Sequence, residues 1–348
     1  MSALAPAVWP AEDAAFARLL VVNPARRTFR DALVSDLESL LRPHDLLVLN
    51  DAATLPGSLV GWSPRGPLEA RLAGPPSDEE LWPAVLFDAG SWRERTEDRR
   101  PPPRLEVGDR IQFEAPGPES GLAAEVVSVS SLSPRLVELR FDHDGARLWR
   151  ALFRVGRPVQ YSYLRAPLPL WHVQTAFAGR PLSAEMPSAG RVLRVPLLRA
   201  LRKKGVAIAT VTHAAGLSST GDLTLDAALP LPELSLIPET AVAAVDEVKG
   251  RGGRVVAVGT TVVRALEGAF REGRLRPGAN RTDLRIGPGF RPRVVAGLLT
   301  GLHEPGDSHF ELLQAFAPRP LLESAIAHAR VEGYLGHEFG DSSLILAE

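Results

Sequence analysis

The 348-residue chain contains no cysteine, which excludes disulfides, thiolate metal ligands and cysteine nucleophiles. Lysine is also scarce, because only Lys203, Lys204 and Lys249 occur among the 40 basic residues. No stretch approaches the roughly 18 apolar residues of a membrane helix. The first residues have no basic segment and carry early acids, so they do not resemble a signal peptide. These absences predict a cytoplasmic protein with no membrane contact.

The composition itself is ordinary for a globular protein, with 45% hydrophobic and 23% charged residues. The length is sufficient for two domains with substantial cores. The formal net charge of −1 gives no overall support for a nucleic-acid partner. Five arginines do cluster in a proline-rich segment, where they indicate either a solvated loop or a contact with a phosphate backbone. They are Arg93, Arg95, Arg99, Arg100 and Arg104.

The pattern of hydrophobic residues changes along the chain. Between residues 57 and 143, short β-rich runs alternate with Gly, Pro and Asp turns, which is typical of a small barrel or sandwich. Outside residues 57–143, segments with helical spacing alternate with segments typical of strands. We therefore predict an α/β main domain formed by both ends of the chain (residues 1–57 and 145–348), with an inserted small β-barrel domain (58–144). In this fold residues 46–49 share a sheet with residues 255–258.

Individual elements follow from periodicity. Apolar runs predict strands at residues 46–49, 206–212 and 254–258. Helical spacing predicts helices over the following segments: 31–41, 146–156, 195–205, 239–253 and 321–334.

One segment, residues 252–267 (GGRVVAVGTTVVRALE), joins a strand to a helix through Gly259, Thr260 and Thr261. Either threonine is a suitable N-cap. Arg264 then lies in the first helical turn, where a cation opposes the helix dipole by a few tenths of a kcal/mol, roughly. The free N–H groups of the turn and Arg264 together suit an anion. The alternative is an ordinary connection with an exposed arginine.

Polar side chains also follow other predicted strands. Asn50 and Asp51 follow residues 46–49, and His213 follows residues 206–212. Asp341 precedes the last apolar run, and His303 lies in a turn before Pro305. Ligands of α/β folds bind beyond the carboxyl ends of strands, so these residues are candidate site residues. Each one taken alone is equally compatible with a turn, cap or structural role.

Known cofactor motifs are missing. His303, Glu304 and His309 do not form HExxH, and Pro305 and Gly306 interrupt any helix between the histidines, so we expect no metal. The chain contains neither GxxxxGK[ST] nor GxGxxG. We interpret residues 216–221 (GLSSTG) as a loop.

Six segments, in order, resemble one enzyme family. Residues 41–59 (LRPHDLLVLNDAATLPGSL) are similar to the family's RPGDLLVLNDTRVIPARL. The remaining five are 174–178 (QTAFA), 187–190 (PSAG), 252–267, 298–316 (LLTGLHEPGDSHFELLQAF) and 331–346 (VEGYLGHEFGDSSLIL). The chain is on this basis similar to the S-adenosylmethionine:tRNA ribosyltransferase-isomerase (QueA) family.

The resemblance implies transfer and isomerisation of the ribosyl moiety of S-adenosylmethionine on a 7-aminomethyl-7-deazaguanine base of tRNA. It implies S-adenosylmethionine as co-substrate, tRNA as acceptor and a monomeric protein. The ligand-binding residues expected from it and from the strand ends are Asn50, Ser188, Gly190, His213, Gly259, Thr260, Thr261 and Arg264. The candidate acids and bases are Asp51, Glu233, Asp341 and His303, without individual roles.

Several polar positions depart from the family pattern. The family's HxMHxE becomes ALPLPEL, in which only Glu233 matches, and LHVGLGTF becomes THAAGLSST. The histidine of PTAGLHFT is replaced near Arg191 and Val192. Two alternatives therefore stand beside the family activity: a divergent enzyme with a non-tRNA acceptor, and a non-catalytic protein that binds a ligand or partner. We also expect tRNA binding that is weaker than in typical members and depends on the arginine cluster.

Overall fold

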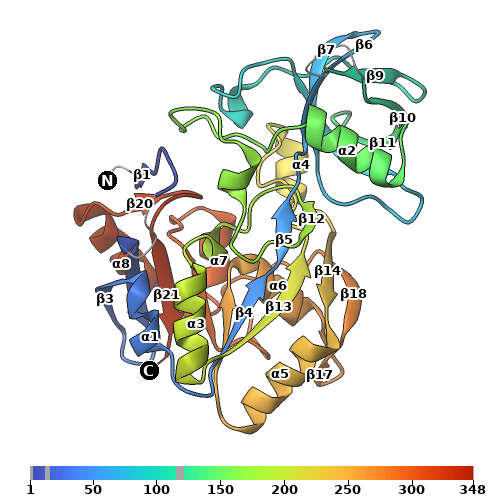
Figure 1. Cartoon of the computed structure of the whole chain (residues 1–348). Helices are drawn as coiled ribbons and strands as arrows, with labels where there is room; N and C mark the ends of the chain where they lie inside the picture. Colours follow the sequence, from blue (N-terminus) through green and yellow to red (C-terminus); the bar gives the residue numbers. More distant parts are fainter. Residues whose placement is uncertain (1–2, 12–15, 115–120, 348) are drawn as a thin grey trace.

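The computed structural model describes residues 3–11, 16–114 and 121–347. Its larger part is a nine-stranded sheet with helices on both faces, and a closed barrel adjoins it (Figure 1). The strand order in the sheet is β18-β14-β13-β4-β15-β19-β21-β2-β3. In chain order these strands are β2 (Arg18–Asn23), β3 (Thr28–Leu33), β4 (Leu46–Asn50), β13 (Ala207–His213), β14 (Glu233–Ile237), β15 (Val255–Val258), β18 (Gly278–Thr282), β19 (Gly297–Gly301) and β21 (Ser342–Leu346).

The centre of the sheet is parallel and buried. Strand β4 pairs in parallel with β13 on one side and with β15 on the other, so residues 46–49 and 255–258 share a sheet as predicted. Leu46 and Val48 belong to one hydrophobic core, and Leu47 and Leu49 belong to a second core on the opposite face. A strand with both faces buried needs a continuous apolar run, which is what this segment has.

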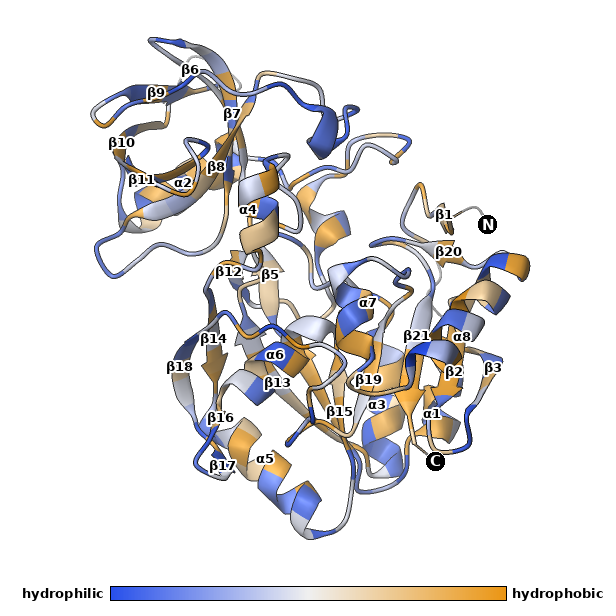
Figure 2. Ribbon diagram, turned by 180° about the vertical axis from the view of Figure 1, so that it is seen from behind, coloured by the Kyte–Doolittle hydropathy of each residue, from blue (hydrophilic) through white to orange (hydrophobic). Residues whose placement is uncertain are grey.

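Helices form the outer layers. Residues of α5, α6, α7 and α8 pack into the first core, and residues of α1 and α3 pack into the second. Figure 2 shows hydrophobic residues along β2, near one edge of the sheet, and both hydrophobic and hydrophilic residues along α5 and α8. The helices are α1 (Leu37–Leu40), α2 (Gly145–Val155), α3 (Val195–Lys204), α4 (Leu223–Ala228), α5 (Glu239–Gly250), α6 (Thr260–Gly268), α7 (Ser308–Leu313) and α8 (Arg319–Val331).

The inserted region forms a closed six-stranded barrel in the order β10-β11-β8-β7-β6-β9. The strands are β6 (Ser58–Ser63), β7 (Gly66–Leu72), β8 (Trp82–Asp88), β9 (Arg110–Phe113), β10 (Ala123–Val129) and β11 (Leu136–Phe141). Helix α2 packs on the barrel core through Leu148, Ala151 and Leu152. The fold class is therefore confirmed. The domain boundaries remain a prediction, and the packing of α2 favours a second boundary beyond Val155.

The two chain crossings between barrel and sheet lie side by side. Ser58 and Arg157 exchange backbone hydrogen bonds of 2.8 and 3.0 Å. A Cβ atom on Gly156 would lie 2.0 Å from the carbonyl oxygen of Pro56, so only glycine fits there. Short strand pairs complete the fold: β1 (Ala5–Pro6) with β20 (Leu335–Gly336), β5 (Ala52–Thr54) with β12 (Arg180–Ser183), and β16 (Phe270–Arg271) with β17 (Arg274–Leu275). Within the described ranges, no helix combines the length and the apolar character needed to cross a bilayer.

The helix predicted over residues 31–41 is wrong at its first three residues. Residues 31–33 belong to β3, and a 3-10 turn (Val34–Asp36) precedes the short α1. Strand β3 pairs along its whole length with β2, and this long-range pairing overrides the local helical spacing. The helices predicted from residues 146, 195, 239 and 321 are confirmed within a few residues as α2, α3, α5 and α8.

Candidate functional site

The candidate site lies where the parallel strands end. Asn50 and His213 are the last residues of β4 and β13, and α6 begins directly after β15. Strand β14 runs antiparallel to β13, so its first residue, Glu233, reaches the same edge. The structure thereby brings Asn50, His213, Thr261, Glu233 and Arg264 together, all of which the sequence had marked as candidates. We call this group the Glu233 cluster.

The Glu233 carboxylate is the centre of the cluster. Its Oε2 atom lies 2.8 Å from Nε2 of His213 and accepts a hydrogen bond from Nη1 of Arg264. Its Oε1 atom accepts a 2.7 Å hydrogen bond from the backbone N–H of Gly216. Burial of Glu233 opposes ionisation, but His213, Arg264 and Gly216 together hold its pKa below the ordinary value. The carboxylate is therefore charged at neutral pH and accepts hydrogen bonds from its neighbours.

Asn50 positions the neighbouring groups. Its Nδ2 atom donates to the carbonyl oxygen of His213 at 2.9 Å and to Oγ1 of Thr261 at 3.4 Å. Its Oδ1 atom accepts from the N–H groups of His213 at 2.9 Å and Ala52 at 3.1 Å. The amide therefore ties the end of β4 to the end of β13 and to the start of α6. An aspartate could not donate these bonds.

Two buried polar atoms of the Glu233 cluster are left open. Among the described residues, Nδ1 of His213 and Nη2 of Arg264 have no hydrogen-bond partner. The side chain of His213 is fully buried and that of Arg264 is 12% exposed. An unsatisfied buried donor or acceptor costs about 1–3 kcal/mol, more for a charged group. Such atoms are expected where a bound ligand supplies the missing partner.

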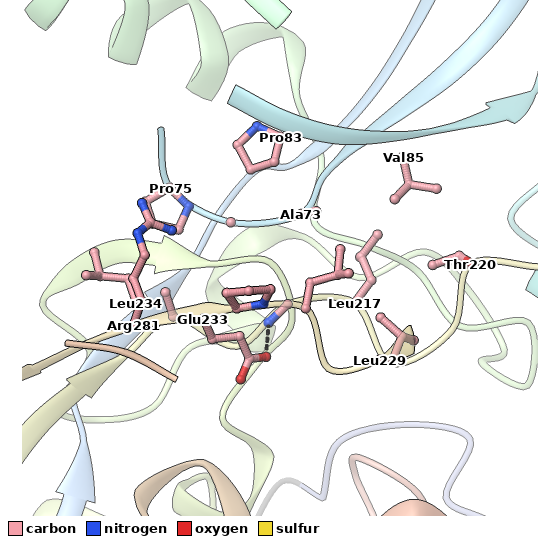
Figure 3. A pocket seen from close by; sticks show the side chains of 15 residues that line it. Ala73, Pro75, Pro83, Val85, Leu217, Thr220, Leu229, Glu233, Leu234 and Arg281 are labelled. Carbon is pink, nitrogen blue, oxygen red and sulfur yellow. Dashed lines mark hydrogen bonds between the residues drawn. The ribbon is translucent and has the colours of Figure 1, made fainter. Parts of the chain in front are cut away.

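A pocket of about 70 Å³ lies beside the cluster, between the barrel and the sheet. Figure 3 shows Pro83 and Val85 of the barrel on one side and Glu233 and Leu217 on the other. The dashed line in the figure marks the hydrogen bond from Gly216 to the Glu233 carboxylate, which lies on the side of the pocket opposite the barrel. Apolar walls with a few convergent polar groups are typical of small-molecule sites, and interfaces between domains favour them.

The start of α6 differs from the sequence prediction. Gly259, with φ of 93°, is the N-cap, and Thr260 is already the first helical residue. Neither threonine caps the helix, because the chain enters it through a backbone conformation that glycine alone adopts readily. Arg264 therefore lies in the second turn, where it donates to Glu233 and, at 3.1 Å, to the carbonyl oxygen of Leu284. In this structure the anion beside Arg264 is the Glu233 carboxylate.

The PSAG segment lies against this helix start. Residues Ser188–Gly190 form a 3-10 turn, and a Cβ atom on Gly259 would lie 3.5 Å from Cβ of Ala189. A Cβ atom on Gly190 would lie 2.7 Å from the ring of Phe177, which explains the glycine and places the QTAFA segment in the same neighbourhood. Three of the sequence segments that suggested the family therefore meet around one helix start.

The other candidate acids and bases have structural partners. Asp51 accepts a hydrogen bond from the hydroxyl of Thr212. Asp341 accepts from the N–H groups of Arg18 at 3.2 Å and Leu335 at 2.8 Å, so it links β2 to β20.

His303 lies 3.0 Å from the hydroxyl of Thr300. Burial of its ring and the neighbouring His309 and His337 lower the pKa of His303 well below the ordinary value, so this histidine is neutral. Over the part of the chain that the structure describes, no group of three His, Asp or Glu side chains is arranged to hold a metal ion.

Sequence reasoning missed Gly216 and Glu185. Residues 216–221 form a loop as predicted, but the loop also carries a site contact, since Gly216 donates to Glu233. Two residues further, the N–H and hydroxyl of Ser218 both lie 3.0 Å from Oε1 of Glu185. Burial, opposed by these bonds from Ser218 and reinforced by Glu338, raises the pKa of Glu185 to about 7. Glycine and serine in such a loop gave no signal of these contacts.

The arginine cluster is divided by the structure. Arg93, Arg95, Arg100 and Arg104 are exposed, whereas Arg99 is buried in the barrel wall between Glu69 and Asp88. Arg99 therefore is not available to a phosphate backbone.

Fold and site together define an α/β protein with an inserted barrel and a ligand-type pocket between the two. The model of the queuosine biosynthesis protein family matches residues 3–345. An S-adenosylmethionine:tRNA ribosyltransferase-isomerase of Methylorubrum extorquens is 34% identical, covering 98% of this chain and 94% of the relative. The protein of the same name from Thermus thermophilus is 36% identical, with coverage of 95% and 92%. The chain belongs to the queuosine biosynthesis protein family.

A solved structure has the same fold. The crystal structure of S-adenosylmethionine tRNA ribosyltransferase from Thermotoga maritima superposes with a TM-score of 0.54 at 24% sequence identity. The superposition covers 98% of this chain and 96% of the other. This chain therefore shares its fold with that protein.

Proposed function

We propose that this protein is an S-adenosylmethionine-dependent tRNA ribosyltransferase-isomerase of queuosine biosynthesis. It transfers the ribosyl moiety of S-adenosylmethionine to 7-aminomethyl-7-deazaguanine in tRNA and isomerises it, while adenine and methionine leave. The observation that carries the proposal is the similarity to named transferases along nearly the whole chain. The unpartnered atoms of His213 and Arg264, and a pocket that Glu233 of the same cluster lines, add independent support.

S-Adenosylmethionine would bind at the start of α6, near Thr260, Ser188 and Arg264. This place combines the free N–H groups of a helix start with a buried arginine whose Nη2 atom lacks a partner among the described residues. A carboxylate such as that of the methionine moiety matches both. His213 Nδ1 offers a second hydrogen-bonding position next to it.

Glu233 and Glu185 are suited to opposite roles. Burial opposes ionisation of Glu233, but contacts with His213, Arg264 and Gly216 lower its pKa, whereas burial raises the pKa of Glu185 to about 7. Two carboxyl groups with pKa values shifted in opposite directions are a recurrent acid–base arrangement. Glu233 remains a carboxylate that stabilises positive charge or accepts a proton, and Glu185 is the proton donor. The backbone of one loop holds both, through Gly216 and Ser218.

The tRNA acceptor sets the place of action. We propose the cytoplasm, where the acceptor is found, and a monomer, because one chain supplies every residue of the Glu233 cluster. S-Adenosylmethionine is the co-substrate, and no metal is required by the residues assigned here.

The test is a turnover assay with purified protein, S-adenosylmethionine and tRNA that carries 7-aminomethyl-7-deazaguanine. We expect one adenine and one methionine released for each ribosyl group found on the tRNA. Release without transfer to tRNA would favour a different acceptor. No release from a folded protein that binds S-adenosylmethionine would leave a ligand-binding role and contradict the enzyme proposal.

A further inference from the structure

Three of the six tryptophans of the chain gather in one region outside the Glu233 cluster. They come from the N-terminal segment, from the loop between β8 and β9, and from the 3-10 turn Leu170–Val173. The region, which we call the tryptophan surface, consists of Trp9, Trp92, Trp171, His172, Arg93 and Arg165. Its aromatic rings and arginines take no part in the activity as derived above.

The rings and one arginine form a connected series. Trp171 is 73% exposed, and its ring meets that of His172 edge to face at 6.0 Å and 75°. His172 in turn meets Trp9 at 5.6 Å and 84°. The guanidinium of Arg165 lies over Trp9, 4.4 Å from the ring centroid. A flat aromatic group in solution could therefore stack on Trp171 with a cation two rings away.

A second aromatic–arginine pair packs on the same buried hydrophobic cluster as Trp9. The guanidinium of Arg93 lies 5.0 Å from the ring centroid of Trp92. Trp9 and Trp92 both pack against one buried hydrophobic cluster, which includes Leu164, Leu168 and Phe339. In Figures 1 and 2 the N-terminal strand β1 and the loop between β8 and β9 lie on the same side of the molecule.

The tryptophan surface is firmly linked to the edge that carries the Glu233 cluster. Oγ1 of Thr54 in β5 donates to the carbonyl oxygen of Val173 at 2.7 Å. The amide of Gln174 pairs with the backbone of Thr54 in both directions, at 2.9 and 3.0 Å. The N–H of Gly179 donates to the carbonyl oxygen of Asp51 at 2.8 Å. The segment after Trp171 thus follows the chain that leaves β4.

Exposed tryptophan beside arginine favours one kind of partner. Burial of an exposed tryptophan against a protein would not require cations, whereas RNA presents base faces next to phosphates. Single-stranded RNA is recognised mainly by stacking on aromatic rings and guanidinium planes. We propose that the tryptophan surface stacks unpaired bases of an RNA loop, with Trp171 as the principal platform and with Arg165 and Arg93 facing the backbone. The proposal rests on the proposed function only for the identification of this RNA as tRNA.

The test is a fluorescence-anisotropy titration of a labelled anticodon stem-loop RNA with the full-length protein and its variants. Stacking on an aromatic ring contributes enough that Trp171→Ala should weaken binding roughly 5- to 150-fold. Trp171→Phe should restore most of the affinity. The matched control is Trp62→Ala, which removes a 57% exposed tryptophan from β6 of the barrel and should leave binding unchanged.

Salt dependence separates the two kinds of contact. Stacking releases no counterions, so Trp171→Ala should keep the slope of log affinity against log salt. Arg165→Ala should lower the slope by about 0.7, the value for one phosphate contact with a single strand. The same RNA annealed to its complement should bind wild type and Trp171→Ala equally, because its bases are no longer free to stack.

The outcomes distinguish this inference from the proposed function. Wild-type RNA binding that Trp171→Ala leaves unchanged would overturn the tryptophan surface and leave the transferase assignment intact. Equal weakening by Trp171→Ala and Trp62→Ala would also overturn it, since the effect would not belong to this surface. No RNA binding by a wild-type protein that binds S-adenosylmethionine would overturn both this inference and the tRNA acceptor.

Discussion

Two buried carboxylates, Glu69 in the barrel and Glu233 at the sheet edge, each contact two potentially cationic side chains. Glu69 pairs with Arg71 and Arg99, and Glu233 pairs with His213 and Arg264. In the barrel the set is closed, because Arg99 donates from all three nitrogens, to Glu69 and to the side chain and backbone of Asp88. At the sheet edge one nitrogen of each partner stays without a hydrogen bond to any described residue.

We propose that this difference separates a structural charge cluster from a binding site. In a closed cluster, the internal hydrogen bonds offset the free-energy cost of burying charged groups. Removal of one partner leaves that cost uncompensated. An open cluster leaves part of the cost uncompensated, which is tolerated where a ligand completes the set. The similar chemistry of the two clusters makes them internal controls for each other.

The largest expected effect is on catalysis. Glu233→Gln removes the charge at the centre of the open cluster while keeping its size and an acceptor oxygen. We expect kcat to fall by about 10²- to 10⁴-fold, the usual range for an acid–base group. Methionine release at saturating substrate measures the change, and thermal unfolding checks that the variant remains folded. A kcat within threefold of wild type would show that Glu233 has a structural role only.

Substitution of Glu69 in the closed cluster should change the stability of the protein rather than its catalysis. Glu69→Gln leaves Arg71 buried without an anion and Arg99 with Asp88 alone, which should lower the free energy of unfolding by about 3–5 kcal/mol. The control is Glu247→Gln, which breaks an exposed ion pair with Arg251 and should cost less than about 1 kcal/mol. Urea denaturation measures both. The folded fraction of Glu69→Gln should retain wild-type kcat, and a selective loss of activity would contradict the structural assignment.

Acid unfolding extends the same prediction. Burial alone would raise the pKa of Glu69, but Arg71 and Arg99 lower it from 4.5 to about 2. The folded pKa is below the unfolded one, so the stabilisation is present above pH 4.5 and is lost as the pH falls toward 2. The shift corresponds to ~3 kcal/mol, an order-of-magnitude figure. Glu69→Gln should lack this part of the acid transition.

A smaller effect concerns the pH profile. Because the pKa of Glu185 is about 7, its protonated, donating form prevails below pH 7 and decreases about tenfold per pH unit well above it. We expect kcat to fall on the alkaline side with this midpoint. Glu185→Gln should lower kcat and abolish that limb. An unchanged alkaline limb in Glu185→Gln would assign the titration to another group. The pKa of Glu185 is higher in the folded than in the unfolded protein. The contribution of Glu185 to the free energy of unfolding therefore decreases as the pH rises from about 4.5 to 7.

The central strands and the edge of the site were predictable from sequence. A short, uninterrupted apolar run such as residues 46–49 is typical of a strand buried on both faces, and it places Asn50 at the carboxyl edge. The link between Glu233 and Arg264 was not predictable, because it joins residues 31 positions apart through tertiary structure. The same holds for Arg99, whose burial depends on closure of the barrel around Glu69.

Local signals failed where long-range pairing or backbone geometry decided. Helical spacing over residues 31–33 was overridden by pairing of β3 with β2. The threonines of the α6 turn suggested a side-chain cap, but the positive φ of Gly259 moved the helix start by one residue. The contact of Gly216 with Glu233 uses a backbone N–H, which no side-chain motif can reveal.

The most direct test of the open cluster is calorimetric titration of S-adenosylmethionine into the folded protein, its Arg264→Met variant and an Arg251→Met control. Arg264 carries the unpartnered nitrogen, whereas Arg251 is an exposed residue paired with Glu247. We predict binding to wild type and control, and a dissociation constant at least tenfold higher for Arg264→Met, since hydrogen bonds to charged groups contribute about 1.5–3 kcal/mol. Equal affinity of all three proteins, or no heat at millimolar ligand with folded wild type, would contradict the assignment of the Glu233 cluster as the ligand site.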